Sequence, residues 1–140
     1  MKILSLDLGD KWTGSALSDA LHISCKPYKT IETENLESSL KTILTQENID
    51  TVVVGYPKTL KGKESQQTKK VIDIKERLDN LFGIIDNKKI SWILWDERLS
   101  SKRAQTKIPP HSSRETKLKE HSIAAAFILQ SYLDYKALNK

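Results

Sequence analysis

Two groups of carboxylates in this sequence stand where strands are expected to end. Asp7 closes an apolar run at the start of the chain, and Asp96-Glu97 follows a second apolar run. Acids brought together from distant segments could hold divalent cations, which activate water and neutralise charge when a phosphodiester bond is hydrolysed. Simpler interpretations are that Asp7 caps the turn through Gly9 and that Asp96-Glu97-Arg98 forms an exposed salt bridge. Strand alternation sends Asp96 and Glu97 to opposite faces, so at most one of them is expected to face the site.

The hydrophobic pattern predicts the elements that position these acids. Apolar or β-branched runs indicate strands, and apolar residues at helical spacing indicate helices. Strands are expected over residues 3–9, 13–18, 25–33, 51–55 and 90–95, and helices over residues 35–47, 64–81 and 118–138. This order predicts an α/β domain whose sheet starts as an antiparallel meander and continues with parallel strands. Ligands of such sheets gather at the carboxyl ends of the strands, where both groups of acids lie.

Length and composition narrow the class of protein. The chain has 140 residues, the usual size of one domain, and carries a net charge of +5 with a pI of about 9.2. The charge is uneven, −3 over residues 1–50 and +8 over residues 51–140, which suits a polyanionic partner but also serves solubility. Cys25 is the single cysteine, so a disulfide scaffold is excluded and a reducing, cytoplasmic setting is expected. Neither a signal peptide nor a membrane span is expected.

Basic residues cluster in two segments beside the expected strand ends. The first follows the fourth strand and contains Lys58, Lys61 and Lys63. The second spans residues 98–119, is expected to be a loop around Pro109-Pro110, and has one acid, Glu115, among its basic residues Arg98, Lys102, Arg103, Lys107, Arg114, Lys117 and Lys119. Such segments could hold nucleic-acid phosphates, and a plain solvated loop is the alternative. Neither segment has an aromatic ladder or a recognition helix, so binding by shape and charge is expected.

Four blocks of the sequence, in order, resemble the YqgF (RuvX-like) nuclease family. They are Leu6-Asp7-Leu8-Gly9 with Ala16-Leu17-Ser18-Asp19, then Val53-Val54-Gly55-Tyr56-Pro57, then Asp96-Glu97-Arg98-Leu99-Ser100, and finally Ser122-Ile123-Ala124-Ala125-Ala126. The resemblance covers nearly the whole chain. It implies a single ribonuclease H-like domain over residues 1–140, with a mixed five-stranded sheet flanked by helices.

The resemblance also implies the site residues. Asp7 becomes the central metal-binding aspartate, and Glu97 rather than Asp96 the second acid, with Mg²⁺ or Mn²⁺ as cofactor. The family usually has a third acid at the start of the last helix, where this chain has His121. His121 could then be a metal ligand that favours Mn²⁺, or a proton-transfer group. The alternatives are that it is a hydrogen-bonded core residue, or that the site is catalytically weakened. Trp12, beside the first turn, could stack on a base or simply pack.

The function implied by the resemblance is a metal-dependent nuclease that matures the 5′ end of precursor 16S rRNA, acting as a monomer or homodimer. A Holliday junction resolvase acting on branched DNA and a catalytically weakened RNA-binding module are the alternatives. The Asp-Leu-Gly turn also resembles the phosphate loop of sugar kinases and related ATPases. Those proteins need two copies of the fold, and this chain has room for one.

Overall fold

The structure is a computed structural model that describes residues 1–56, 66–96 and 114–139, with the side chains of residues 114–117 outside the description. The elements are β1 (Lys2–Asp7), β2 (Trp12–Ser18), β3 (Cys25–Glu32), the 3-10 turn η1 (Thr33–Asn35), α1 (Leu36–Gln46), β4 (Ile49–Tyr56), α2 (Gln66–Phe82), β5 (Ile84–Ile85), β6 (Lys88–Lys89), β7 (Ser91–Asp96) and α3 (Arg114–Leu138). The predicted order of strands and helices is confirmed. The hairpin β5–β6 is an addition that the hydrophobic pattern did not predict.

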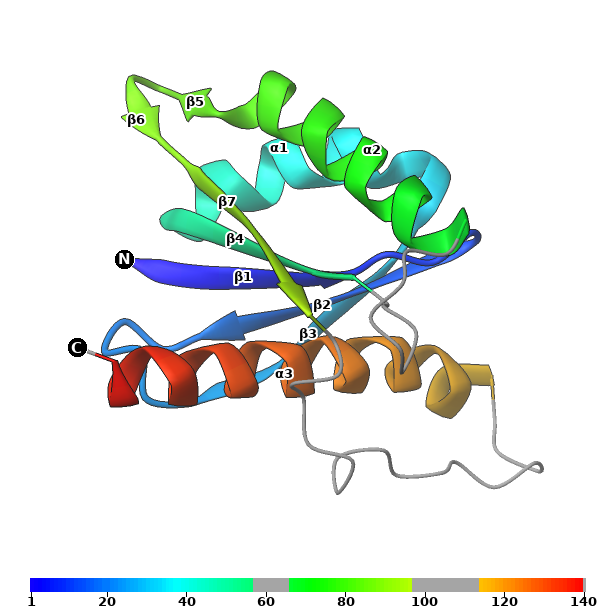
Figure 1. Ribbon diagram of the computed structural model, residues 1–140. Helices are drawn as coiled ribbons and strands as arrows, with labels where there is room; N and C mark the ends of the chain where they lie inside the picture. The colour runs from blue at the N-terminus through cyan, green and yellow to red at the C-terminus, as the bar shows by residue number, and fades with distance from the viewer. Residues whose placement is uncertain (57–65, 97–113, 140) are drawn as a thin grey trace.

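The central sheet is mixed, as predicted. Its strand order is β3-β2-β1-β4-β7, with β1 in the middle (Figure 1). The pairs β1–β2 and β2–β3 are antiparallel, and the pairs β1–β4 and β4–β7 are parallel. Short connections allow the antiparallel meander, whereas the parallel pairs need the crossovers that carry α1 and α2.

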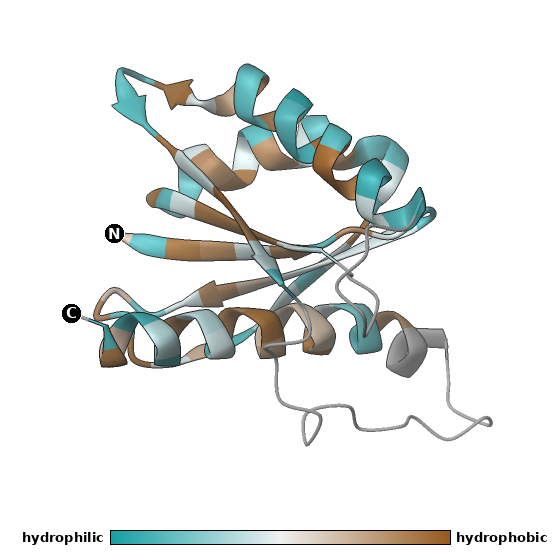
Figure 2. Cartoon of the chain, in the orientation of Figure 1, coloured by the Kyte–Doolittle hydropathy of each residue, from teal (hydrophilic) through white to brown (hydrophobic). Residues whose placement is uncertain are grey.

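Helices cover both faces of this sheet, with α1 and α2 on one side and α3 on the other (Figure 1). Strand β1 shows how its side chains divide between the two faces. Leu4 and Leu6 belong to the larger core beneath α1 and α2, whereas Ile3 belongs to the smaller core beneath α3. Because side chains alternate along a strand, Ser5 and Asp7 share the α3 face with Ile3. Figure 2 shows the hydrophobic residues concentrated on the central strands.

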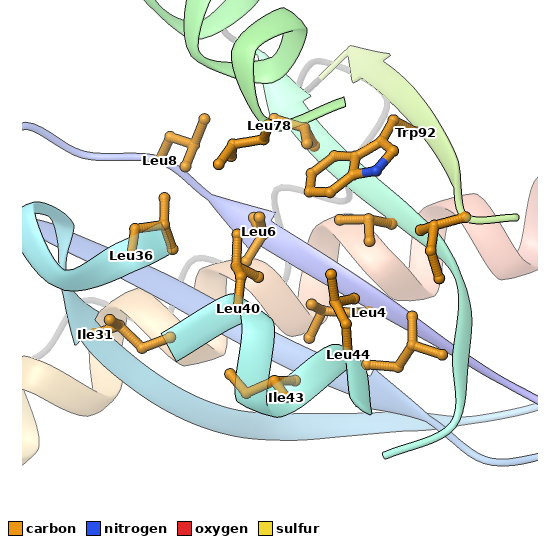
Figure 3. Packing of buried hydrophobic residues seen from close by; sticks show 14 of the residues in the cluster. Leu4, Leu6, Leu8, Ile31, Leu36, Leu40, Ile43, Leu44, Leu78 and Trp92 are labelled. Carbon is orange, nitrogen blue, oxygen red and sulfur yellow. The ribbon is translucent and has the colours of Figure 1, made fainter. Parts of the chain in front are cut away.

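The larger core fixes the sheet as a rigid platform. Helix α1 contributes Leu40 and Leu44, which lie over Leu4 and Leu6 of β1 (Figure 3). All four side chains are at most 1 % exposed. Truncating any of them to Ala should cost about 2–5 kcal/mol, so β1, the strand that carries Asp7, is held firmly.

Most element boundaries differ from the prediction by one or two residues, and the start of α3 differs by four. Strand β4 begins at Ile49 rather than Thr51, because Ile49 is fully buried and pairs with Lys2 of β1. Helix α3 begins at Arg114 rather than Leu118, so the prediction of a loop over residues 98–119 is wrong from Arg114 onward. Among the described residues, no helix has the length and apolar character needed to cross a membrane.

Candidate active site

Asp7 is the last residue of β1 and lies in the middle of the sheet. It is half-buried, and its Cα partners are Gly14 of β2 and Gly55 of β4. Residues paired across neighbouring strands point to the same face, so on the α3 side Asp7 is flanked by two positions that have no side chain. Neither neighbour of Asp7 in this row contributes a side chain, so other elements can approach the sheet closely beside it.

Asp96, the last residue of β7, faces away from Asp7. Its neighbour Trp95 packs with the α3-side core and donates a hydrogen bond from Nε1 to Ser131 Oγ on α3 at 2.7 Å. Trp92 and Leu94 pack in the core on the other face. Alternation places Asp96 with Trp92 and Leu94, on the face of α1 and α2. The sequence pattern did not decide whether Asp96 or Glu97 faces the site. Asp96 lies on the opposite face of the sheet from Asp7.

Helix α3 makes close backbone contact with the sheet beside Asp7. A Cβ atom built on Gly14 would overlap the backbone carbonyl of His121 and stand 2.8 Å from the amide nitrogen of Ser122. Only a glycine lets the helix approach this closely. The backbone of His121 therefore lies against the residue that pairs with Asp7.

A second contact fixes the register of α3 along β1. The hydroxyl of Ser5 donates a hydrogen bond to the carbonyl oxygen of Ala125 at 2.7 Å. Ser5 and Asp7 are two residues apart, about 6.7 Å along a strand, and Ala125 and His121 are four residues apart, about 6 Å along a helix. The two spacings match, so His121 lies level with Asp7 in the way that Ala125 lies level with Ser5.

His121 lies on the sheet-facing side of α3, as its spacing predicts. It is half-buried, and residues four and seven positions later, Ala125 and Ile128, are buried in the α3-side core. Glu120 is exposed, so it points elsewhere. Within the described residues, the backbone of His121 lies against the strand partner of Asp7, and no group of three potential metal ligands is present.

The turn after Asp7 is held by a residue that sequence reasoning missed. The hydroxyl of Thr33 donates to the carbonyl oxygen of Gly9 at 2.7 Å, and its amide donates to that of Lys11 at 2.9 Å. Since this hydroxyl has given its one proton to Gly9, the hydroxyl of Thr13 donates the 2.9 Å bond between the two threonines. Thr33 thus bonds both carbonyls of the turn. In the sequence, only its position just after a predicted strand could have indicated this role.

Trp12 lies beside this turn, at the edge of a hollow of about 320 Å³. The Nζ atom of Lys11 is 5.8 Å from the centroid of its ring, within the range of a cation–π contact. Three of the five lining residues are acidic, so the hollow does not suit a phosphate group. The lining residues are Asp10, Lys11, Trp12, Glu32 and Glu34.

Most of the other predicted site residues lie outside the described part of the chain. These are Glu97 and the basic residues Lys58, Lys61, Lys63, Arg98, Lys102, Arg103 and Lys107. Arg114 and Lys117 are on the first turns of α3, but their side chains are not described, and Lys119 is exposed on the same helix.

Comparison with known proteins identifies the family of the chain. Residues 1–135 match the family model described as "RuvX: Holliday junction resolvase". The chain belongs to the RuvX family. A RuvX relative named "Putative pre-16S rRNA nuclease" from Desulfitobacterium hafniense is 36% identical over 138 residues, covering 96% of this chain and 93% of the relative. A relative with the same name from Caldicellulosiruptor bescii is 35% identical, covering 96% and 97%.

The chain also shares its fold with a solved structure of RuvC. The chain aligns with Thermus thermophilus RuvC in complex with a Holliday junction substrate at a TM-score of 0.64. The alignment covers 100% of this chain and 97% of RuvC, at 10% sequence identity, and so shows the fold alone. The predicted α/β fold is confirmed. As a member of the RuvX family, the protein is a nuclease, a hydrolase of phosphodiester bonds.

Proposed function

We propose that this RuvX protein cleaves precursor 16S rRNA during maturation of its 5′ end, in the cytoplasm, with Mg²⁺ or Mn²⁺ held by Asp7, Glu97 and His121. The observation that carries the proposal is the contact of the His121 backbone with Gly14, the strand partner of Asp7. This contact sets the backbone of His121 against the strand partner of Asp7, which supports a metal site shared by the two residues. The names of the relatives supply the substrate.

The described part of this site suits a divalent ion. Asp7 offers carboxylate oxygens, the donors that Mg²⁺ prefers, and His121 offers a neutral nitrogen that shifts the preference toward Mn²⁺. Asp96 faces away from Asp7, which supports Glu97 as the second acid. A bound divalent ion would supply activated water and neutralise the charge that develops on the phosphate.

The roles of the protein groups follow from their placement. Asp7 stands on a strand that is hydrogen-bonded on both sides, so its carboxylate needs little reorganisation when a ligand binds. His121 is held by backbone contact rather than by a flexible loop, so it can present its ring at a fixed height. We place the RNA backbone along the two basic segments, which contain Lys58, Lys61, Lys63, Arg98, Lys102, Arg103, Lys107, Arg114 and Lys117.

Two alternatives have specific support. The description of the family model and the fold shared with RuvC favour resolution of branched DNA, for which a homodimer would supply two sites. His121, in the position of the family's usual third acid, favours a catalytically weakened RNA-binding module. A monomer suffices for cleavage of one RNA strand.

A cleavage assay separates these functions. The parent protein is incubated with a precursor 16S rRNA 5′ leader and, separately, with a four-way DNA junction, with Mg²⁺ or Mn²⁺. We expect cleavage of the RNA, and loss of cleavage in Asp7→Asn with RNA binding retained. Asp10→Asn is the control, because Asp10 is an exposed acid of the same turn, paired with Lys70 at 3.0 Å.

Each other outcome has a defined meaning. Cleavage of the junction alone would favour the resolvase, and tight RNA binding without cleavage under either metal would favour the binding module. Full activity in Asp7→Asn would refute the proposed metal site.

A further inference from the structure

Ser5 is a polar residue in an apolar setting. It is completely buried in the middle of β1, between Leu4 and Leu6, yet it is not part of either hydrophobic core. Its hydroxyl donates to the carbonyl oxygen of Ala125, 120 residues later in the chain. A buried hydroxyl needs a partner, so this bond satisfies Ser5.

The hydrogen bonding of α3 at Ala125 is complete without the bond from Ser5. In a regular α-helix the carbonyl of Ala125 already accepts the amide N–H of Leu129, and its second lone pair is free for another donor. An alanine at position 5 would therefore leave no helix group unsatisfied. The consequence of the bond is geometric, because it fixes one point of α3 against one point of β1.

That fixed point is one helical turn from His121 and two strand residues from Asp7. We propose that Ser5 is a positioning residue, whose hydrogen bond to Ala125 sets the height of α3 along β1 and thereby places His121 level with Asp7. This role rests on the proposed function, because it assumes that Asp7 and His121 act on one metal ion.

Contacts on the other side of α3 explain why the bond of Ser5 matters. Thr30 of β3 donates to the carbonyl oxygen of Leu118 at 2.6 Å and shares a 2.6 Å hydrogen bond with Ser122. These bonds hold the helix to the edge strand of the sheet, two strands away from Asp7. Among the hydrogen bonds described between strand side chains and α3, the bond of Ser5 comes from β1, the strand that carries Asp7, whereas the others come from β3 and β7. Without it, the bonds that remain come from β3 and β7, so we expect α3 to shift along β1 within the limit set by its backbone contact with Gly14.

The test compares Ser5→Ala with a matched serine variant. Ser18→Ala is the control, because Ser18 is 4% exposed and its hydroxyl also bonds backbone groups, those of Ile3 and Asp19. Ser18 is the last residue of β2, beside the end of β1 that is opposite to Asp7, and its described hydrogen bonds do not reach α3. Both variants should lose thermal stability.

The informative measurement is Mn²⁺ binding to the free protein, followed by calorimetry, together with kcat and KM for RNA cleavage. We expect Ser5→Ala to bind Mn²⁺ about tenfold more weakly and to lose kcat by a similar factor, because residues that orient metal ligands have effects of this size. KM for the RNA should stay unchanged. Ser18→Ala should keep the parent's Mn²⁺ affinity and kcat.

The remaining results would overturn the proposal. Parent-like Mn²⁺ affinity in Ser5→Ala, or an equal loss in Ser18→Ala, would show that Ser5 only supports the fold. If Ser5→Ala does not fold, Ser5→Cys takes its place, since a thiol is a weaker donor in nearly the same volume, and unchanged affinity would again refute the role. A parent protein that binds Mn²⁺ no better than Asp7→Asn would instead refute the proposed metal site, and the role of Ser5 with it.

Discussion

Gly14→Ala tests whether the close approach of α3 is what assembles the site. The added methyl group is fixed on the Gly14 backbone and would overlap the backbone carbonyl of His121. No rotamer change can relieve it. The helix must therefore move away from β2 by about 1 Å or more to reach an ordinary van der Waals separation.

This displacement gives the expected magnitudes. Overpacking of a well-packed core typically costs about 1–3 kcal/mol, which for a chain of this size lowers Tm by roughly 4–12 °C. A misplacement of about 1 Å in a catalytic group can reduce the rate by about 100-fold. We therefore expect Gly14→Ala to fold, to melt earlier, and to lose far more activity than its stability predicts.

Thermal melts and RNA cleavage rates measured well below Tm check this result. Gly83→Ala is the control, because a Cβ there would stand 2.7 Å from the carbonyl oxygen of Asp79, after α2 on the other face of the sheet. It should lower Tm and leave cleavage unchanged. Near-parent cleavage by folded Gly14→Ala would refute the reasoning, since His121 would then not need its observed position.

Three further predictions concern His121, the basic segment after β7, and Cys25. His121→Asp should raise the rate of cleavage with Mg²⁺ relative to Mn²⁺, and His121→Ala should lose most activity with both metals, as cleavage rates in each metal would measure. Parent-like rates in His121→Ala would mean that His121 only packs. Replacing Lys102, Arg103 and Lys107 together by alanine should weaken the salt dependence of RNA binding. The slope of log K against log salt concentration should change by at most about three units, and an unchanged slope would mean that these residues are only solvated. Burial, followed by repulsion from Asp134 and Asp19, raises the pKa of the Cys25 thiol from 9.0 to about 11. The folded state therefore keeps a proton that the unfolded state loses, so the free energy of unfolding should fall between about pH 9 and 11, and urea titrations should show a shallower fall in Cys25→Ala.

Hydrophobic periodicity predicted the long elements of the fold but not their irregular ends. The first turn of α3, Arg114 to Lys117, has no apolar residue to reveal the helical period. The hairpin β5–β6 has strands of two residues each, too short for any period. Its turn residues Asp86 and Asn87 both have positive φ, of 49° and 65°, and an Asp-Asn pair was the available signal.

The site was predictable where it depended on strand ends, and unpredictable where it depended on tertiary contacts. Alternation predicted that at most one of Asp96 and Glu97 faces the site, but the packing of Trp95 against α3 was needed to show that Asp96 lies on the face opposite to Asp7. Ser5 and Thr33 received no predicted role, because the value of a hydroxyl depends on the carbonyl that it meets. For Ser5 that carbonyl is 120 residues away.

The bond between Ser5 and Ala125 also has a consequence for the order of folding. It joins the first strand to the last helix, and closing a segment of this length carries an entropic cost that the contacts within β1–β2 or β2–β3 do not. The meander can therefore form while α3 is still undocked. During synthesis Asp7 emerges early and His121 late, so a nascent chain would hold half of the proposed site without the other. Cleavage activity should thus be absent from the growing chain and arise when α3 docks.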